Sequence, residues 1–191
     1  MIKPFNDIVV PECSLDTSKV LNIYNELLPL ENVEGALGEV GVYKGGTAVV
    51  MRRVYPDRPF HLYDTFTGIV GAIPGVDVHL NGDFGDACLD KVQKLLSENS
   101  IYHVGIFPST FSEWDVKFAF VHSDTDTYMG TKESLIHFAP RIAVGGKLVF
   151  DDYEWKGCPG VKKAVDEWLT TYAIENWKIS KYEYQIVFQR I

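Results

Sequence analysis

Apolar residues that follow one another without alternation mark the predicted strands of this chain. One run covers residues 118–123, and Asp124 and Asp126 follow it directly. A second run covers residues 147–150 and is followed by another pair of carboxylates. Such runs are typical of strands that are buried on both faces, because helices cover both faces of a parallel sheet. Two strands are therefore predicted to end in acidic pairs.

Other segments complete an alternating order of strands and helices. Residues 177–180 and 184–189 are too close in sequence for a helical crossover, so they predict a final hairpin. Gly145 and Gly146 predict a turn into the strand that ends at Asp151. Further strands are predicted at 36–42, 59–64 and 101–105, and helices at 16–28, 48–55, 86–97, 131–138 and 161–172.

This order predicts an α/β fold. We expect a doubly wound, Rossmann-like sheet of about seven strands, mostly parallel, with an antiparallel last strand and helices on both faces. A length of 191 residues suits one domain, and no linker or internal repeat divides the chain. We expect a single domain over residues 1–191, in which residues 1–35 form an N-terminal cap segment.

Charge, cysteine content and the length of apolar runs indicate which partners and which cellular compartment the protein has. The net charge of -8 argues against a nucleic-acid partner, which would favour a basic face. Cys13, Cys88 and Cys158 are odd in number and far apart, so they suit neither a disulfide framework nor a zinc site. No apolar run approaches the length of a membrane span, and the first residues lack a signal-peptide pattern. We expect a cytoplasmic protein without a membrane partner.

A glycine turn between a strand and a helix suggests a ligand site. Residues 38–47 place Gly41, Gly45 and Gly46 where the chain passes from the first predicted strand into a helix. Glycine lets the backbone approach a ligand closely, and the helix N-terminus adds free N–H groups. The spacing departs from the dinucleotide pattern, and an ordinary turn would explain the glycines equally well. Together with Asp64, placed where such folds bind ribose hydroxyls, the turn favours a nucleoside pocket.

The acidic pairs carry the stronger signal. Asp124, Asp126, Asp151 and Asp152 follow two strands of one strand-helix-strand unit, whose ends lie at the same edge of the sheet. Each Asp alone could simply cap a turn or a helix. Four carboxylates at one edge repel one another, and a bound cation such as Mg²⁺, Ca²⁺ or Mn²⁺ removes that conflict.

The remaining candidates are weaker or excluded. Residues 65–82 form a long glycine-rich loop of the kind that acts as a lid or binding loop. The sequence contains neither a G-x-S-x-G nucleophile motif nor a Walker-type phosphate loop. All histidines are expected to be structural, and they are His61, His79, His103, His122 and His137.

Five stretches, in order, resemble a known family. The stretches are residues 38–46, 63–68, 124–128, 145–153 and 157–166. As a set they resemble the macrocin O-methyltransferase (TylF-type) family, whose members are metal-dependent and use S-adenosylmethionine. The resemblance implies a class I methyltransferase fold and an enzyme that methylates a hydroxyl of a sugar or another polyhydroxylated small molecule. It also makes a homodimer an expectation.

The resemblance further implies roles for particular residues. Mg²⁺, or another hard divalent cation, would be held by Asp124, Asp151 and Asp152, and Asp126 would be the general base that takes the proton of the acceptor hydroxyl. The alkoxide would then attack the sulfonium methyl. Residues 65–82 and the segment around Trp155 would form the acceptor walls. The residues that fall where the family binds the cofactor are Glu39, Gly41, Tyr43, Gly45, Asp64, Thr65, Phe107 and Asp124.

Two other functions remain open on the sequence. Asp124-Thr125-Asp126 could be the D-x-D element of a metal-dependent glycosyltransferase that uses a nucleotide sugar, although the glycine turn and Asp151-Asp152 would then have no role. Alternatively, the chain could bind S-adenosylmethionine without catalysis, if the acidic residues serve folding only.

Overall fold

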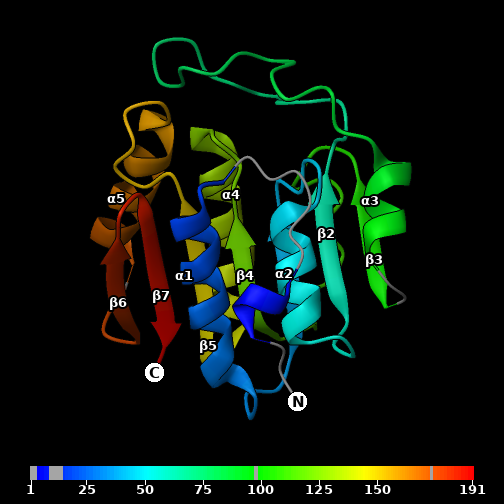
Figure 1. Cartoon of the computed structure of the whole chain (residues 1–191). Helices are drawn as coiled ribbons and strands as arrows, with labels where there is room; N and C mark the ends of the chain where they lie inside the picture. The colour runs from blue at the N-terminus through cyan, green and yellow to red at the C-terminus, as the bar shows by residue number, and fades with distance from the viewer. Residues whose placement is uncertain (1–3, 9–14, 97–98, 173) are drawn as a thin grey trace.

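Seven strands form one sheet in the computed structural model, which describes residues 4–8, 15–96, 99–172 and 174–191 (Figure 1). Across the sheet the strands follow the order β3-β2-β1-β4-β5-β7-β6. Their bounds are β1 Ala36–Val40, β2 Phe60–Asp64, β3 Ser100–Val104, β4 Phe118–Ser123, β5 Ile142–Asp151, β6 Trp177–Tyr182 and β7 Gln185–Arg190.

Strand direction agrees with the prediction. Every neighbouring pair from β3 to β5 is parallel, and β7 is antiparallel to both β5 and β6. The mostly parallel α/β sheet and the final hairpin are therefore confirmed. The strand order changes direction at β1, which lies between β2 and β4. In open sheets of this type, ligands bind beyond the carboxyl ends of the strands at such a switch point.

Helices cover both faces of the sheet (Figure 1). One apolar cluster joins α1, α2 and α3 to the first face, and a second cluster joins α4 and α5 to the opposite face. Because side chains alternate across a strand, Phe120 of β4 packs in the first cluster and Val121 in the second. The helix bounds are α1 Thr17–Leu27, α2 Gly46–Val54, α3 Leu89–Leu95, α4 Tyr128–Phe138 and α5 Pro159–Thr171, with 3-10 turns at Phe5–Asp7, Leu28–Leu30 and Ala139–Arg141.

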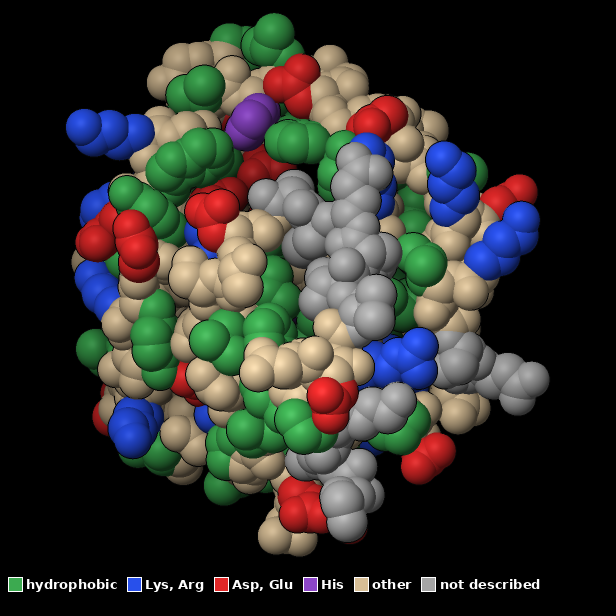
Figure 2. Space-filling model, in the orientation of Figure 1, with side chains coloured by type: hydrophobic (Ala, Val, Ile, Leu, Met, Phe, Trp, Pro, Cys, Tyr) green, Lys and Arg blue, Asp and Glu red, His purple; other side chains and the backbone are tan. Residues whose placement is uncertain are grey.

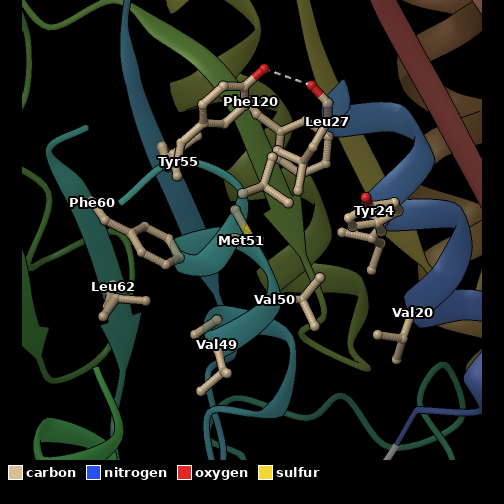
Figure 3. Close-up of a cluster of buried hydrophobic side chains, with 14 of the residues drawn as sticks. Val20, Tyr24, Leu27, Val49, Val50, Met51, Tyr55, Phe60, Leu62 and Phe120 are labelled. Atoms are coloured by element: carbon tan, nitrogen blue, oxygen red, sulfur yellow. Dashed lines mark hydrogen bonds between the residues drawn. The ribbon is translucent and has the colours of Figure 1, made fainter. Parts of the chain in front are cut away.

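Figure 3 shows the first cluster, where α1 and α2 pack against β2 and β4. Leu27 of α1 and Met51 of α2 are fully buried there, as is Phe120 of the sheet. Burial of a side chain of this size stabilises the fold by about 1.5–3 kcal/mol. The hydroxyl of Tyr55 donates a hydrogen bond of 2.9 Å to the carbonyl oxygen of Leu27 and so ties α1 to the end of α2.

Two predicted helices have different bounds in the structure. The helix expected over 86–97 covers only Leu89–Leu95, and Ser97 lies outside the described residues. The helix expected from residue 131 begins earlier, at Tyr128, because the side chain of Thr127 accepts a hydrogen bond from the N–H of Gly130 and caps the helix.

The prediction of a turn at Gly145 and Gly146 is wrong. Both glycines lie inside β5, which begins at Ile142. The pairing of β4 with β5 shifts between Phe118 and Phe120, and Gly145 has a positive φ of 84°. A bulge at this glycine accommodates extra residues in β5, so the strand starts before the glycines rather than after them.

Two further findings concern membrane-spanning helices and the cysteines. Within the described part of the chain, no helix has the length and apolar character needed to span a membrane. Cys88 and Cys158 carry free thiols, as expected, and Cys13 lies outside the described residues.

Candidate active site

The ends of β4 and β5 bring acidic side chains together. The two strands pair in parallel register up to Ser123 opposite Phe150, so the residues that follow leave from the same edge of the sheet. One carboxylate oxygen from each of Asp124, Asp126 and Asp152 lies within 4.8 Å of the other two. Asp126 and Asp152 have left-handed backbone conformations, with φ of 57° and 59°, which Asp adopts more readily than most residues. Three of the four acids expected at this edge of the sheet, Asp124, Asp126 and Asp152, therefore converge.

Lys19 of α1 reaches the same cluster. Its Nζ lies 2.6 Å from Oδ1 of Asp152 and 3.0 Å from Oδ2 of Asp151. The side chain of Lys19 is only 11% exposed, and that of Asp151 is fully buried. The second oxygen of Asp151, Oδ1, is buried and has no hydrogen-bond partner among the described residues. Asp151 thus adjoins the other acids, with a lysine held between its carboxylate and that of Asp152.

Burial and mutual repulsion raise the pKa values of Asp124, Asp126 and Asp151. Burial is the main cause for Asp124, and the charges of Asp151 and Asp126 add to it. Burial, followed by the charge of Asp152, raises the pKa of Asp126 to about 8. For Lys19, burial alone would lower the pKa, but the charges of Asp151 and Asp152 outweigh it and raise the pKa. One lysine therefore does not balance the negative charge that full ionisation of Asp124, Asp126 and Asp151 would bring.

The donor set suits a hard divalent cation. Carboxylate oxygens are the ligands that Mg²⁺ prefers in proteins. The buried Oδ1 of Asp151 lacks a partner among the described residues, and a cation would supply one. The geometry also places Asp126 within reach of the same point as Asp124 and Asp152. The residues present therefore fit such an ion. The acids whose oxygens lie within 4.8 Å of one another are Asp124, Asp126 and Asp152, whereas the resemblance implies Asp124, Asp151 and Asp152, and that ligand set stays a prediction.

A cavity of about 370 Å³ opens beside the acids. It lies at the carboxyl ends of the parallel strands, and residues 65–88 arch over this end of the sheet (Figure 1). Figure 2 shows acidic side chains and a histidine in a recess at the same end of the molecule. Residues of the cavity wall that the sequence had already suggested are Gly41, Tyr43, Asp64, Thr65, Phe107, Asp124, Asp126 and Asp152.

Asp64 orders the glycine turn. Its Oδ2 accepts hydrogen bonds from the backbone N–H groups of Val42, at 2.7 Å, and Tyr43, at 2.8 Å. Its Oδ1 accepts a third, from the N–H of Phe66 at 2.6 Å. A Cβ at Gly41 would lie 1.8 Å from the carbonyl oxygen of Asp124, so only glycine fits where β1 meets the end of β4. Asp64 therefore joins the turn to the start of the long loop.

Phe107 supplies a fixed aromatic surface in the cavity wall. Its ring stacks on Phe138 of α4, with 5.5 Å between centroids and 9° between planes. A ring held in this way can stack with a purine base without losing further side-chain freedom. The role of Phe107 in adenine binding, which the resemblance implies, stays a prediction.

Two predicted cofactor residues do not line the cavity. Glu39 is 1% exposed, and its Oε1 contacts Nδ1 of His122 at 3.1 Å behind the wall. Gly45 has a φ of 81° and caps the start of α2, where a Cβ would come within 3.3 Å of Val92. The structure thus gives Gly45 a helix-capping and packing role, while its part in cofactor binding stays a prediction.

The long loop brings to the site residues that no sequence motif marks. His79 lines the cavity, with Nδ1 at 3.3 Å from Oδ2 of Asp83, and Nε2 is buried without a partner among the described residues. One nitrogen of His79 lies within 4.8 Å of both a carboxylate oxygen of Asp126 and the sulfur of Cys158. The Cys158 thiol donates a hydrogen bond to Oδ1 of Asp126 at 3.4 Å.

Three other histidines, His61, His103 and His137, contact protein groups outside the acidic cluster. His61 and His103 contact each other, at 3.1 Å between Nδ1 and Nε2, and both lie near Glu113. His137 of α4 contacts the carbonyl oxygen of Glu133. These contacts agree with the expected structural roles.

Comparison with known proteins identifies the family. The model of the family described as macrocin-O-methyltransferase (TylF) matches residues 19–190. The demethyldecarbamoylnovobiocin O-methyltransferase of Streptomyces niveus is 30% identical over 168 residues, which cover 75% of this chain and 61% of the relative. The 8-demethyl-8-(2,3-dimethoxy-alpha-L-rhamnosyl)-tetracenomycin-C 4'-O-methyltransferase of Streptomyces olivaceus is 29% identical over 170 residues, 79% of this chain and 64% of the relative. The chain thus spans less than two thirds of the length of these relatives.

The solved structures agree with the sequence matches. The O-methyltransferase NovP has a TM-score of 0.77 and 26% identity with this chain, over 90% of this chain and 79% of NovP. The expected class I methyltransferase fold is confirmed by this similarity and by the strand order. The match over residues 19–190 also includes both acidic pairs and Lys19. This chain belongs to the macrocin O-methyltransferase (TylF) family.

Proposed function

We propose that this chain transfers a methyl group from S-adenosylmethionine to a hydroxyl of a sugar-bearing acceptor, at a site that uses Mg²⁺ or a similar cation. The observation that carries the proposal is the position of Asp126, which lies beside Asp124 and Asp152 on the wall of the cavity that also contains the glycine turn. Donor, acceptor and base can therefore meet in one place.

The donor would lie along the turn after β1. Gly41 leaves the backbone open to close approach, and Asp64 lies at the end of β2, where folds of this type bind ribose hydroxyls. Phe107 offers its ring to the adenine. These contacts would hold the sulfonium methyl toward the acidic cluster, and alignment of the reactants supplies much of the rate.

The acceptor would enter beneath the long loop. Val70 and Phe84 of the loop line the cavity together with Trp155 and Tyr184. Aromatic faces and neighbouring carboxylates suit a ring that carries several hydroxyls. The name of the tetracenomycin relative includes a rhamnosyl group and a 4'-O-methylation, which supports a sugar as the acceptor class here.

Asp126 would take the proton. It lies close enough to the predicted ligands to reach the same hydroxyl. A bound cation would offset the repulsion by Asp152 that raises the pKa of Asp126, which would leave the carboxylate ionised and able to accept the proton. The hydroxyl oxygen forms a bond to the methyl carbon, the bond from sulfur to that carbon breaks, and the proton passes to the Asp126 carboxylate. A divalent cation bound by Asp124, Asp151 and Asp152 would act as a Lewis acid that lowers the pKa of the hydroxyl.

Calorimetry tests the proposal against the alternatives. Titration of the protein with S-adenosylhomocysteine should give saturable binding, whereas UDP-sugars with Mn²⁺ should give none. The reverse result would favour a glycosyltransferase that uses Asp124 and Asp126 as its D-x-D element. Binding of S-adenosylhomocysteine without methyl transfer to any hydroxylated acceptor would favour the non-catalytic binding module.

Two expectations about the setting accompany the proposal. A homodimer is proposed on the family resemblance, and its test is the mass of the protein in solution by light scattering.

A cytoplasmic location agrees with the free thiols of Cys88 and Cys158.

A further inference from the structure

Lys19 occupies the position of a cation between two of the predicted metal ligands. Its ammonium group contacts Oδ2 of Asp151 at 3.0 Å and Oδ1 of Asp152 at 2.6 Å. We infer that Lys19 is the resident cation of this cluster and that it sets the affinity for divalent ions by competing with them. The inference rests on the proposed cation site, and it concerns what this chain adds to that site.

The competition follows from the closeness of two positive charges at the same pair of acids. Mg²⁺ binds carboxylate oxygens at about 2.1 Å and demands near-octahedral geometry. Lys19 engages Oδ2 of Asp151 and Oδ1 of Asp152, so an ion shared by these two acids would have to bind their remaining oxygens directly beside the ammonium group. Two cations at neighbouring positions also repel each other strongly in a buried site. The ion and the ammonium group therefore exclude each other from the space between these two acids.

Two aromatic rings near Lys19 could receive its ammonium group after displacement by an ion. Its Nζ lies 5.9 Å from the ring centroid of Trp155 and 6.0 Å from that of Tyr184. Both rings line the cavity, and aromatic faces attract an ammonium group at such distances. A movement of Lys19 toward these rings would free the carboxylates without unfolding α1.

The exchange would also connect the ion to the cavity wall. Lys19 lies near the start of α1, and Leu15 and Asp16 just before it line the cavity. In the ion-free protein, the contacts of Lys19 tie this end of α1 to the carboxyl end of β5. Divalent ions would release that connection, so Lys19 couples the ionic state of the cluster to the wall that faces the acceptor.

Titration with Mn²⁺ alone tests the inference, with free Mn²⁺ measured by electron paramagnetic resonance and no donor or acceptor present. Lys19→Met should bind Mn²⁺ at least about tenfold more tightly than the wild type, which corresponds to about 1.4 kcal/mol. Lys19→Arg keeps the charge and should stay near the wild-type affinity. Lys163→Met removes the same charge from α5, where Lys163 pairs with Glu167 at 3.6 Å, and should change little.

Thermal unfolding gives a second readout that needs no activity. Lys19→Met leaves the buried Asp151 without its partner, so its unfolding temperature in EDTA should fall below that of the wild type. Saturating Mg²⁺ should then raise the unfolding temperature of Lys19→Met more than that of the wild type. If the methionine variant fails to fold, Lys19→Gln takes its place, with the same direction expected in both measurements.

The outcomes separate the two claims. If the wild type and Lys19→Met bind Mn²⁺ with equal affinity, Lys19 does not compete with the ion, although the cation site itself is supported. Absence of Mn²⁺ binding in both proteins would overturn the competition together with the proposed cation site. Tighter binding in Lys163→Met to the same degree as in Lys19→Met would show a general charge effect and would also overturn the role of Lys19.

Discussion

The carboxylate of Asp77 accepts a hydrogen bond of 2.8 Å from the backbone N–H of Tyr128, at the start of α4. Its other oxygen accepts a hydrogen bond from the N–H of Ile73 within the loop. Gly160 of α5 packs against this contact, because a Cβ there would come within 2.0 Å of Oδ1 of Asp77. The long loop is thus attached to the helix that follows Asp124 and Asp126.

Removal of this contact should loosen the loop. In Asp77→Ala the N–H of Tyr128 loses a charged acceptor, which costs about 1.5–3 kcal/mol locally. We expect faster amide hydrogen exchange over residues 66–86 and a higher KM for the acceptor. Asp115→Ala, at an exposed position outside the loop, is the control. Equal exchange in Asp77→Ala and the wild type would show that the contact does not hold the loop.

Asp126→Asn tests the base. The amide keeps the size of the side chain but cannot take a proton, so turnover should fall by roughly 10²-fold or more. Binding of Mn²⁺ and of S-adenosylhomocysteine should stay close to the wild type. A near-normal turnover rate would remove Asp126 from the mechanism and would direct attention to His79 on the same wall.

Asp151→Ala tests the predicted ligand set. Loss of this carboxylate should abolish Mg²⁺-dependent turnover, while the affinity for S-adenosylhomocysteine should change little, because Asp151 does not line the cavity. Asp166→Ala, which removes a carboxylate of α5 that pairs with Lys162, is a matched control. Turnover that persists in Asp151→Ala and still depends on Mg²⁺ would show that the other acids suffice.

Stability in EDTA should depend on pH through Asp126. An Asp in the unfolded chain ionises near pH 4, whereas burial and Asp152 raise the folded pKa of Asp126 to about 8. The folded state therefore holds a proton that the unfolded state has lost, and this contribution to the free energy of unfolding declines as the pH rises from about 4 to about 8. The slope is at most about 1.4 kcal/mol per pH unit.

Urea unfolding between pH 6.5 and 8.5 measures this effect as the difference between the wild type and Asp126→Asn. The range avoids most of the opposing titration of His61 and His103, whose pKa values burial lowers. Asp152 and the Cys158 thiol face Asp126 and are present in both proteins, as are Asp124 and Asp151. A wild type that loses no more stability than Asp126→Asn over this range would contradict the raised pKa.

Local pattern was enough to predict the sheet and the convergence of the acids. The apolar runs before Asp124 and Asp151 predict two neighbouring parallel strands. Because the carboxyl ends of such strands lie at the same edge of the sheet, the acids that follow them lie close together. Gly145 was misread because a glycine in a bulge and a glycine in a turn look alike in sequence. Glu39 lies in a strand that is buried on both faces, so the sequence pattern does not show which way its side chain points. In the structure it contacts His122 and does not line the cavity.

Contacts between distant segments could not be predicted in the same way. Lys19 and Asp151 are 132 residues apart, and in sequence Lys19 is one polar position of an amphipathic helix. Asp77 and His79 lie in a loop whose path depends on contacts with α4 and within the loop itself. The short spacing of Asp77, His79 and Asp83 was the one available signal, and such spacings are common in ordinary turns.

Transfer of a labelled methyl group is the decisive measurement for cation-dependent methylation by this protein. The protein, S-adenosylmethionine with a labelled methyl, and a panel of sugar-bearing acceptors with free hydroxyls are incubated with Mg²⁺ or with EDTA. The account predicts label on an acceptor oxygen with Mg²⁺, loss of transfer in EDTA, and recovery when Mg²⁺ is restored. Transfer that EDTA leaves unchanged would contradict the role of the cation, and a protein that neither labels any acceptor nor binds S-adenosylhomocysteine would contradict the account as a whole.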